Sequence, residues 1–246
     1  MTRLFKKTET IIIFLVLLGG GLRLGYCICY PVQPRDAYTY ESVIREWEES
    51  GTIPETIDYF PLSLWILKIP HSIFRYDIVK GGIIINQICG LFLIIFLAII
   101  TKKYFRKNYV MIFVGLLVAT NPSLVHFSCS FLRENIYLVF ATLSLLFLLK
   151  YWDATKKRDL LKASMFGALA SMCRLEGFEF LVFFLIISFV AFLLKRIQFI
   201  KFFVHSVLFF IIFLATTVSV CRIMDFNGVK TKALFSNLKT VEINTL

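Results

Sequence analysis

The feature that most constrains this chain is a series of long apolar runs separated by short polar segments. A helix needs about 20 apolar residues to cross roughly 30 Å of hydrocarbon. The 246-residue chain is 58% hydrophobic and only 17% charged, whereas a soluble domain carries about a quarter charged residues. We therefore predict an all-α polytopic transmembrane bundle of about seven spans, the fifth of them short. The predicted spans are Thr10–Tyr30, Val79–Ile100, Tyr109–Val125, Phe131–Lys150, Leu160–Cys173, Phe178–Leu194 and Phe202–Val220.

The net charge of +11 comes from basic clusters between alternate spans. Short basic loops lie on the cytoplasmic side of a membrane, so this distribution favours a membrane topology over a nucleic-acid partner. We expect a multi-pass protein with a cytoplasmic N-terminus, in the cell inner membrane if the host is bacterial. The clusters are Arg3, Lys6 and Lys7; Lys102, Lys103, Arg106 and Lys107; Lys150, Lys156, Lys157, Arg158 and Lys162; and Lys195, Arg196 and Lys201.

This topology predicts a transmembrane module over residues 1–220, an outer loop at 31–78 within it, and an outer tail at 221–246. The basic start could belong to a signal peptide, but the apolar run is too long and lacks a cleavage site, so we expect it to stay uncleaved. In the outer loop, Ala37, Tyr40, Ile44 and Trp47 recur at helical spacing. They predict an amphipathic helix lying flat at the membrane interface, and Pro61–Phe74 predicts a second interfacial helix.

Six short motifs resemble elements of the GT-C glycosyltransferases of the protein mannosyltransferase and aminoarabinose transferase type. They cover most of the chain from the first span to the sixth. An Arg ends the first span, an Asp opens the outer loop, and two Arg–Glu elements follow later. The motifs are Leu22–Leu24, Arg35–Tyr40, Glu49–Gly51, Tyr59–Leu64, Leu132–Tyr137 and Cys173–Gly177.

The resemblance implies an inverting transfer on the outer face, in which a sugar leaves polyprenyl phosphate for an acceptor. Asp36 would be the general base of this reaction. A carboxylate near a bilayer, partly desolvated, holds a proton more readily and suits that role. Asp36 could instead be only the N-cap of the following helix. Ala37 stands where many family members have a second acidic residue, which counts against a metal site built on that pair.

The leaving phosphate needs cationic partners because negative charge develops on it. Arg23, Lys68, Arg133 and Arg174 are the candidates, since each lies at an outer span end or in the outer loop. Arg23 and Lys68 could simply snorkel to the interface, and the two Arg–Glu elements could form local ion pairs. Glu134, Glu176, Tyr40 and Tyr59 are the supporting residues that we expect around the site.

No metal centre or nucleotide loop is predicted, because the six Cys residues form no CxxC pair and the chain has no Gly-rich phosphate loop. A disulfide could form if the outer compartment is oxidising, but scattered membrane cysteines without a pairing are the favoured interpretation. A divalent metal ion is the one cofactor left open. The expected partners are a polyprenyl-phosphate-linked sugar, membrane lipids, and an acceptor that is a lipid, a glycan or a protein.

Members of the resembled family are about twice this length, so we expect the chain to match their N-terminal half. Two further possibilities stay open: a second subunit supplies further spans, or the chain is an inactive truncated member of the family. The alternative from another class is a non-catalytic multi-pass protein, either a flippase-like transporter or an assembly subunit. The enzyme hypothesis also predicts a geometry, in which Asp36, Arg133, Glu134, Arg174 and Glu176 border one outward-facing cavity beneath the two interfacial helices.

Overall fold

The computed structural model describes residues 2–50, 61–194 and 199–223, and within these ranges every regular element is helical. This confirms the predicted all-α class. The elements are α1 (Thr2–Cys29), α2 (Arg35–Ser50), α3 (Pro61–Phe74), α4 (Ile78–Phe105), α5 (Asn108–Thr120), α6 (Pro122–Ser128), α7 (Glu134–Ala154), α8 (Lys157–Ser171), the 3-10 helix η1 (Leu175–Phe178), α9 (Glu179–Leu193) and α10 (Phe199–Ile223).

Four of these helices are long and apolar enough to cross a membrane: α1, α4, α7 and α10. A fifth span results if α5 and α6, which meet at a bend of 56°, are counted as one. The chain is thus a multi-pass membrane protein. The predicted number of seven spans exceeds this count because α8 and α9 have 15 residues each. At 1.5 Å per residue, such a helix is about 22 Å long and falls short of the hydrocarbon thickness.

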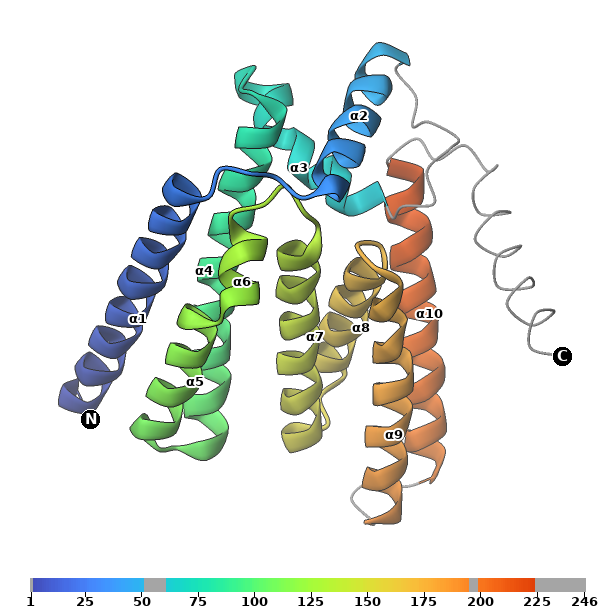
Figure 1. Ribbon diagram of the computed structural model, residues 1–246. Coiled ribbons are helices and arrows are strands. Elements are labelled where there is room, and N and C mark those ends of the chain that lie inside the picture. Colours follow the sequence, from blue (N-terminus) through green and yellow to red (C-terminus); the bar gives the residue numbers. More distant parts are fainter. Residues whose placement is uncertain (1, 51–60, 195–198, 224–246) are drawn as a thin grey trace, which may run out of the picture.

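Figure 1 shows the long helices side by side, with α2 and α3 together at one end of the bundle. We call this the α2–α3 end. Because neighbouring spans run in opposite directions, the end of α1, the start of α7 and the end of α10 all reach it. The opposite end carries the turn between α4 and α5 and the turn between α7 and α8. The predicted helices at 37–47 and 61–74 are confirmed as α2 and α3, and their interfacial placement stays a prediction.

The largest core lies beneath α2 and α3. The buried face of α2 is formed by Ala37, Tyr40, Val43 and Ile44. All but Val43 belong to the helical stripe seen in the sequence, and Trp47, the last member of that stripe, is partly buried. This stripe packs with residues of α3, α4 and the α6–α7 loop, including Phe131, which is fully buried. The core therefore fixes α2 against the loop that precedes α7.

A break in the third predicted span creates the most polar part of the bundle interior. Pro122 has no N–H, so it cannot bond the carbonyl of Val118 four residues earlier, and the span bends there. The side chain of Arg23, 1% exposed, donates to the oxygens of Val118 (3.4 Å) and Ala119 (3.2 Å). It also donates to Ser128 Oγ at 2.9 Å. Arg23 thus supplies hydrogen-bond donors to backbone oxygens at the bend. It does so at the C-terminal end of α5, where the helix dipole favours a cation.

Two buried Asn side chains continue this network from Ser128 into α4 and α7. The side-chain amide of Asn135 donates to Ser128 Oγ at 2.8 Å and to the backbone oxygen of Asn86 at 3.1 Å. Asn86 in turn donates to the oxygens of Ser130 (2.8 Å) and Leu132 (2.6 Å). A Cβ on Gly90 would meet Arg23 and Ser128, so the glycine makes room for the network. The segment from 128 to 135 is thus bonded to α1 through Arg23 and to α4 through Asn86.

We expect Arg23→Ala to destabilise the protein by about 2–3 kcal/mol, because it removes the donor side chain that reaches the carbonyls of Val118 and Ala119. Thermal unfolding of the detergent-solubilised chain measures the effect as a lowered Tm. Leu24→Ala, which truncates the next side chain of α1 where it is exposed, is the control and should change Tm little. Equal stability of the two variants would contradict the structural role of Arg23.

Candidate functional site

Asp36 lies at the α2–α3 end, in the first turn of α2, with its side chain exposed. The helix begins one residue earlier, at Arg35, so Asp36 stands inside the helix and not at the N-cap position of the simpler alternative. A carboxylate in the first turn still interacts favourably with the helix dipole. Placement alone is compatible with both a stabilising and a catalytic role.

Gln33 ties the segment before α2 to the loop between α6 and α7. Its amide group donates to the oxygen of Cys129 at 3.3 Å and accepts from the N–H of Phe131 at 2.8 Å. Asp36 follows Gln33 by three residues and Arg133 follows Phe131 by two. This pair of hydrogen bonds therefore brings the Asp36 and Arg133 elements to the same end of the bundle, although nearly a hundred residues separate them in sequence.

Arg174, after α8, forms the centre of an ionic cluster. Its guanidinium donates to both oxygens of Glu176, at 2.6 and 3.2 Å, and to Glu134 Oε1 at 2.6 Å. Glu134 is the first residue of α7, so the contact joins the two predicted Arg–Glu elements. The hydrogen bonds to Glu176 raise the pKa of Arg174 above its ordinary value. The same contact lowers the pKa of Glu176.

The turn that carries Arg174 depends on Gly177. The chain folds back so tightly after α8 that a Cβ on Gly177 would overlap the backbone of Ala170 and Ser171. Only glycine fits such an approach. This gives a physical reason for the final Gly of the Cys173–Gly177 motif, because the close turn directs Arg174 toward Glu134.

Arg133 joins the cluster from the other side. Its guanidinium lies over the ring of Tyr40, 5.8 Å from the centroid, and it interacts electrostatically with Glu176. Tyr40 is one helical turn after Asp36 on α2 and is 2% exposed. The stacked guanidinium and ring therefore connect α2 to the start of α7.

Lys68 belongs to a separate contact between α2 and α3. Its ammonium group lies 3.6 Å from Glu48 Oε1 and 4.9 Å from the centroid of the Trp47 ring. His71 also contacts Glu48, with 3.2 Å between Nε2 and Oε2. These contacts are at the far end of α2 from Asp36.

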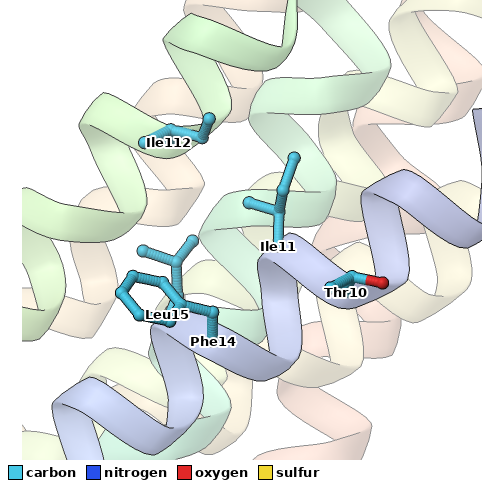
Figure 2. Close-up of a pocket in the computed structure, with 5 residues that line it drawn as sticks. All are labelled: Thr10, Ile11, Phe14, Leu15 and Ile112. Atoms are coloured by element: carbon cyan, nitrogen blue, oxygen red, sulfur yellow. The ribbon is translucent and has the colours of Figure 1, made fainter.

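The structure thus gathers Arg133, Glu134, Arg174, Glu176 and Tyr40 in one cluster beside α2, the helix that carries Asp36. Arg23 lies elsewhere, inside the bundle, and Tyr59 falls outside the described residues. The predicted cavity stays a prediction. The hollow drawn in Figure 2, of about 520 Å³, is apolar and lies between α1 and α5 at Thr10, Ile11, Phe14, Leu15 and Ile112.

No group of three or more His, Cys, Asp or Glu side chains that could hold a metal ion occurs within residues 2–50, 61–194 and 199–223. The cluster around Arg174 offers two carboxylates, and both are engaged with a guanidinium. The divalent ion that the sequence left open therefore stays a prediction without a ligand set in these ranges.

Sequence reasoning missed Gln33, Ser128 and Asn135 as positioning residues. Polar residues in or beside an apolar run were the available signal, since buried polar groups need partners. A polar residue in an apolar run does not show which residue its hydrogen-bond partner is. Each bond joins elements that lie far apart in the sequence.

The lowered pKa of Glu176 predicts a pH-dependent stability. Its native carboxyl binds a proton less readily than the unfolded one, so the contact stabilises the fold above the ordinary Glu pKa of about 4.3. The contribution is lost as the pH falls through the lowered pKa. Because the Glu176 side chain is 46% exposed, solvent limits it to roughly 0.2–1 kcal/mol.

We therefore expect Glu176→Gln to lower Tm near pH 7 and to approach the unmodified protein in Tm as the pH falls below 4. Parallel Tm measurements on the two proteins across this range test the prediction. A difference that stayed constant with pH would show that the ion pair is not its source.

The family model of the dolichyl-phosphate-mannose-protein mannosyltransferases matches residues 58–220. No curated protein matches the chain. The matched region includes the Arg133–Glu134 element and the Arg174 turn, and it begins after α2, so it does not include Asp36. Since the match covers about two thirds of the 246 residues, the chain belongs to the dolichyl-phosphate-mannose-protein mannosyltransferase family of membrane glycosyltransferases.

Proposed function

We propose that the chain transfers a sugar from a polyprenyl-phosphate donor to an acceptor at the α2–α3 end, with inversion at the anomeric carbon. The observation that carries this proposal is the family match, together with the convergence of its two Arg–Glu elements on one cluster. Asp36 is the general base in this proposal. It takes the acceptor proton as the acceptor attacks and polyprenyl phosphate leaves.

Arg174 and Arg133 are the proposed partners of the leaving phosphate. A guanidinium binds phosphate through the same two-pronged geometry with which it binds carboxylate, and Arg174 shows that geometry toward Glu176. The two glutamates hold the guanidinium in place before the donor arrives. A phosphate oxygen can then replace the exposed Glu176 on the guanidinium while Glu134 keeps its contact.

Lys68 is a weaker candidate and Arg23 is left out of the donor site. Lys68 is engaged with Glu48, at the end of α2 remote from Asp36. Arg23 uses its N–H groups on backbone oxygens and on Ser128, and it is 1% exposed. These contacts favour a structural role for Arg23.

The charges of the two ends support an outward-facing site. The end opposite α2 and α3 is strongly basic and carries Lys102, Lys103, Arg106, Lys107, Lys156, Lys157 and Arg158. At the α2–α3 end, acidic residues such as Glu46, Glu49 and Asp77 offset the basic ones. Under the positive-inside rule, this distribution supports a cytoplasmic basic end and an outer Arg174 cluster.

A transporter or assembly subunit remains the alternative function. A transporter would place polar groups along a path through the spans. The buried donor groups of Arg23, Asn86 and Asn135 instead bond backbone oxygens and the hydroxyl of Ser128. This arrangement supports the enzyme over the transporter.

We expect Asp36→Asn to lower sugar transfer at least about 100-fold, because it keeps the shape of the side chain and removes the base. Membranes containing the full chain are incubated with radiolabelled mannosyl polyprenyl phosphate, and label in acceptor is counted. Glu46→Gln removes another exposed carboxylate from the same helix and should leave transfer unchanged. Full transfer by Asp36→Asn would refute the assigned base, and no transfer by the unmodified chain would refute the proposal for this donor.

Arg174→Lys keeps the charge and removes the two-pronged geometry, so we expect the KM for the donor to rise about tenfold or more. Kinetics at varied donor concentration in the same membranes measure this. Lys80→Ala, which removes an exposed cation from α4 at the same end of the bundle, is the control. An unchanged KM for Arg174→Lys would exclude Arg174 from the donor site.

A further inference from the structure

Two cysteines at the α2–α3 end lie against each other, although one belongs to α1 and the other follows α6. Cys129 is 3% exposed, and its Sγ donates to the backbone oxygen of Arg23 at 3.0 Å. In a helix the same oxygen accepts from the N–H four residues later, which is that of Cys27. Both cysteines therefore meet at a single carbonyl group.

The side chain of Cys27 points toward the same place. A helical Cα–Cβ bond tilts toward the N-terminus of its helix, so the Cys27 side chain leans back toward the turn that contains Arg23. The Cys129 thiol interacts with both the side chain and the backbone N–H of Cys27. Next to them, Tyr26 of α1 contacts His126 of α6, with 3.2 Å between the hydroxyl and Nδ1. The two thiols thus lie next to each other.

We propose that Cys27 and Cys129 form a disulfide that fastens the end of α1 to the loop between α6 and α7. Cys27 is partly exposed and is the thiol that a reaction partner reaches. Its Sγ accepts from Gln87 Nε2 at 3.1 Å, and the thiolate form of such a thiol is the nucleophile in disulfide exchange. Cys129, buried behind it, is the resolving thiol.

The oxidant is the disulfide of a thiol–disulfide oxidoreductase in the outer compartment. The Cys27 thiolate attacks one sulfur of that disulfide and forms a mixed disulfide, which releases the enzyme's other sulfur as a thiolate. The Cys129 thiolate then attacks the Cys27 sulfur and displaces the second enzyme sulfur. The two cysteines lose two protons and two electrons, and the oxidoreductase leaves as a dithiol.

This disulfide would act on the loop that leads to the proposed site. Cys129 is followed by Phe131, which Gln33 binds, and by the Arg133–Glu134 element. A covalent link to α1 holds the start of that loop at the end of the first span. The inference does not depend on sugar transfer and shares with that proposal only the outward orientation.

The test is mass spectrometry of the full chain in native membranes, alkylated before and after reduction. We expect a peptide pair linked through Cys27 and Cys129, with both residues protected from alkylation until reductant is added. Protection of neither residue in native membranes would overturn the proposal. Protection of only one would overturn it as well, because an internal disulfide consumes both thiols.

Variants with two cysteines give the matched control. One chain keeps only Cys27 and Cys129, and the other keeps only Cys29 and Cys129, with Ser at the remaining positions. Cys29 is exposed and lies two residues, or about 200°, further round α1. We expect polyethylene-glycol maleimide to shift the first chain on a gel only after reduction, and the second without it. Identical behaviour of the two chains would refute the specific pairing.

The same Cys29 reports the orientation. A membrane-impermeant maleimide added to intact cells should label Cys29 if the α2–α3 end faces outward. Failure to label it would place both thiols in the reducing compartment and overturn the disulfide. Labelled Cys29 with absent sugar transfer would refute the proposed function and leave the disulfide standing.

Discussion

The structure depends on the hydrogen bonds that Arg23 donates to the backbone at the bend between α5 and α6. Pro122 interrupts a span, and the carbonyls that this leaves without donors cannot turn to water in hydrocarbon. Arg23 supplies the donors from the neighbouring helix, at the negative end of the α5 dipole. The guanidinium also reaches Ser128 beyond the bend. One buried cation therefore links α1, α5 and α6 by hydrogen bonds.

The geometry of the candidate site depends on the hydrogen-bond network that begins at Arg23. Ser128 is shared by Arg23 and Asn135, and Asn86 holds the loop oxygens that follow. A loop fixed in this way gives Gln33 stable partners, and Gln33 brings α2 and Asp36 to the same end. At the other edge, the close turn at Gly177 presents Arg174 to Glu134. Charged side chains from two distant segments, 133–134 and 174–176, thus meet beside α2.

The sequence predicted the helices better than it predicted the role of each charged residue. The apolar runs at Val79–Ile100 and Phe131–Lys150 are confirmed as the spans α4 and α7, because hydrophobic length is a local property. The runs at Leu160–Cys173 and Phe178–Leu194 form helices too short to count as spans. Arg23 showed the same signal as Arg174, a cation near a span end. Only the positions of its partners separated a structural role from a candidate functional one.

The sequence by itself determined the environment of this protein and its family. Long apolar stretches must be covered by lipid or by one another, and the motifs around Arg133 and Arg174 are local enough to be recognised along the chain. The tertiary structure alone decided which charges meet. Ion pairs and hydrogen bonds act over about 3 Å, and the contacts from Arg174 to Glu134 and from Gln33 to Phe131 join residues 40 and 98 positions apart. No periodicity or composition encodes such a distance, because it results from how the bent span and its neighbours pack.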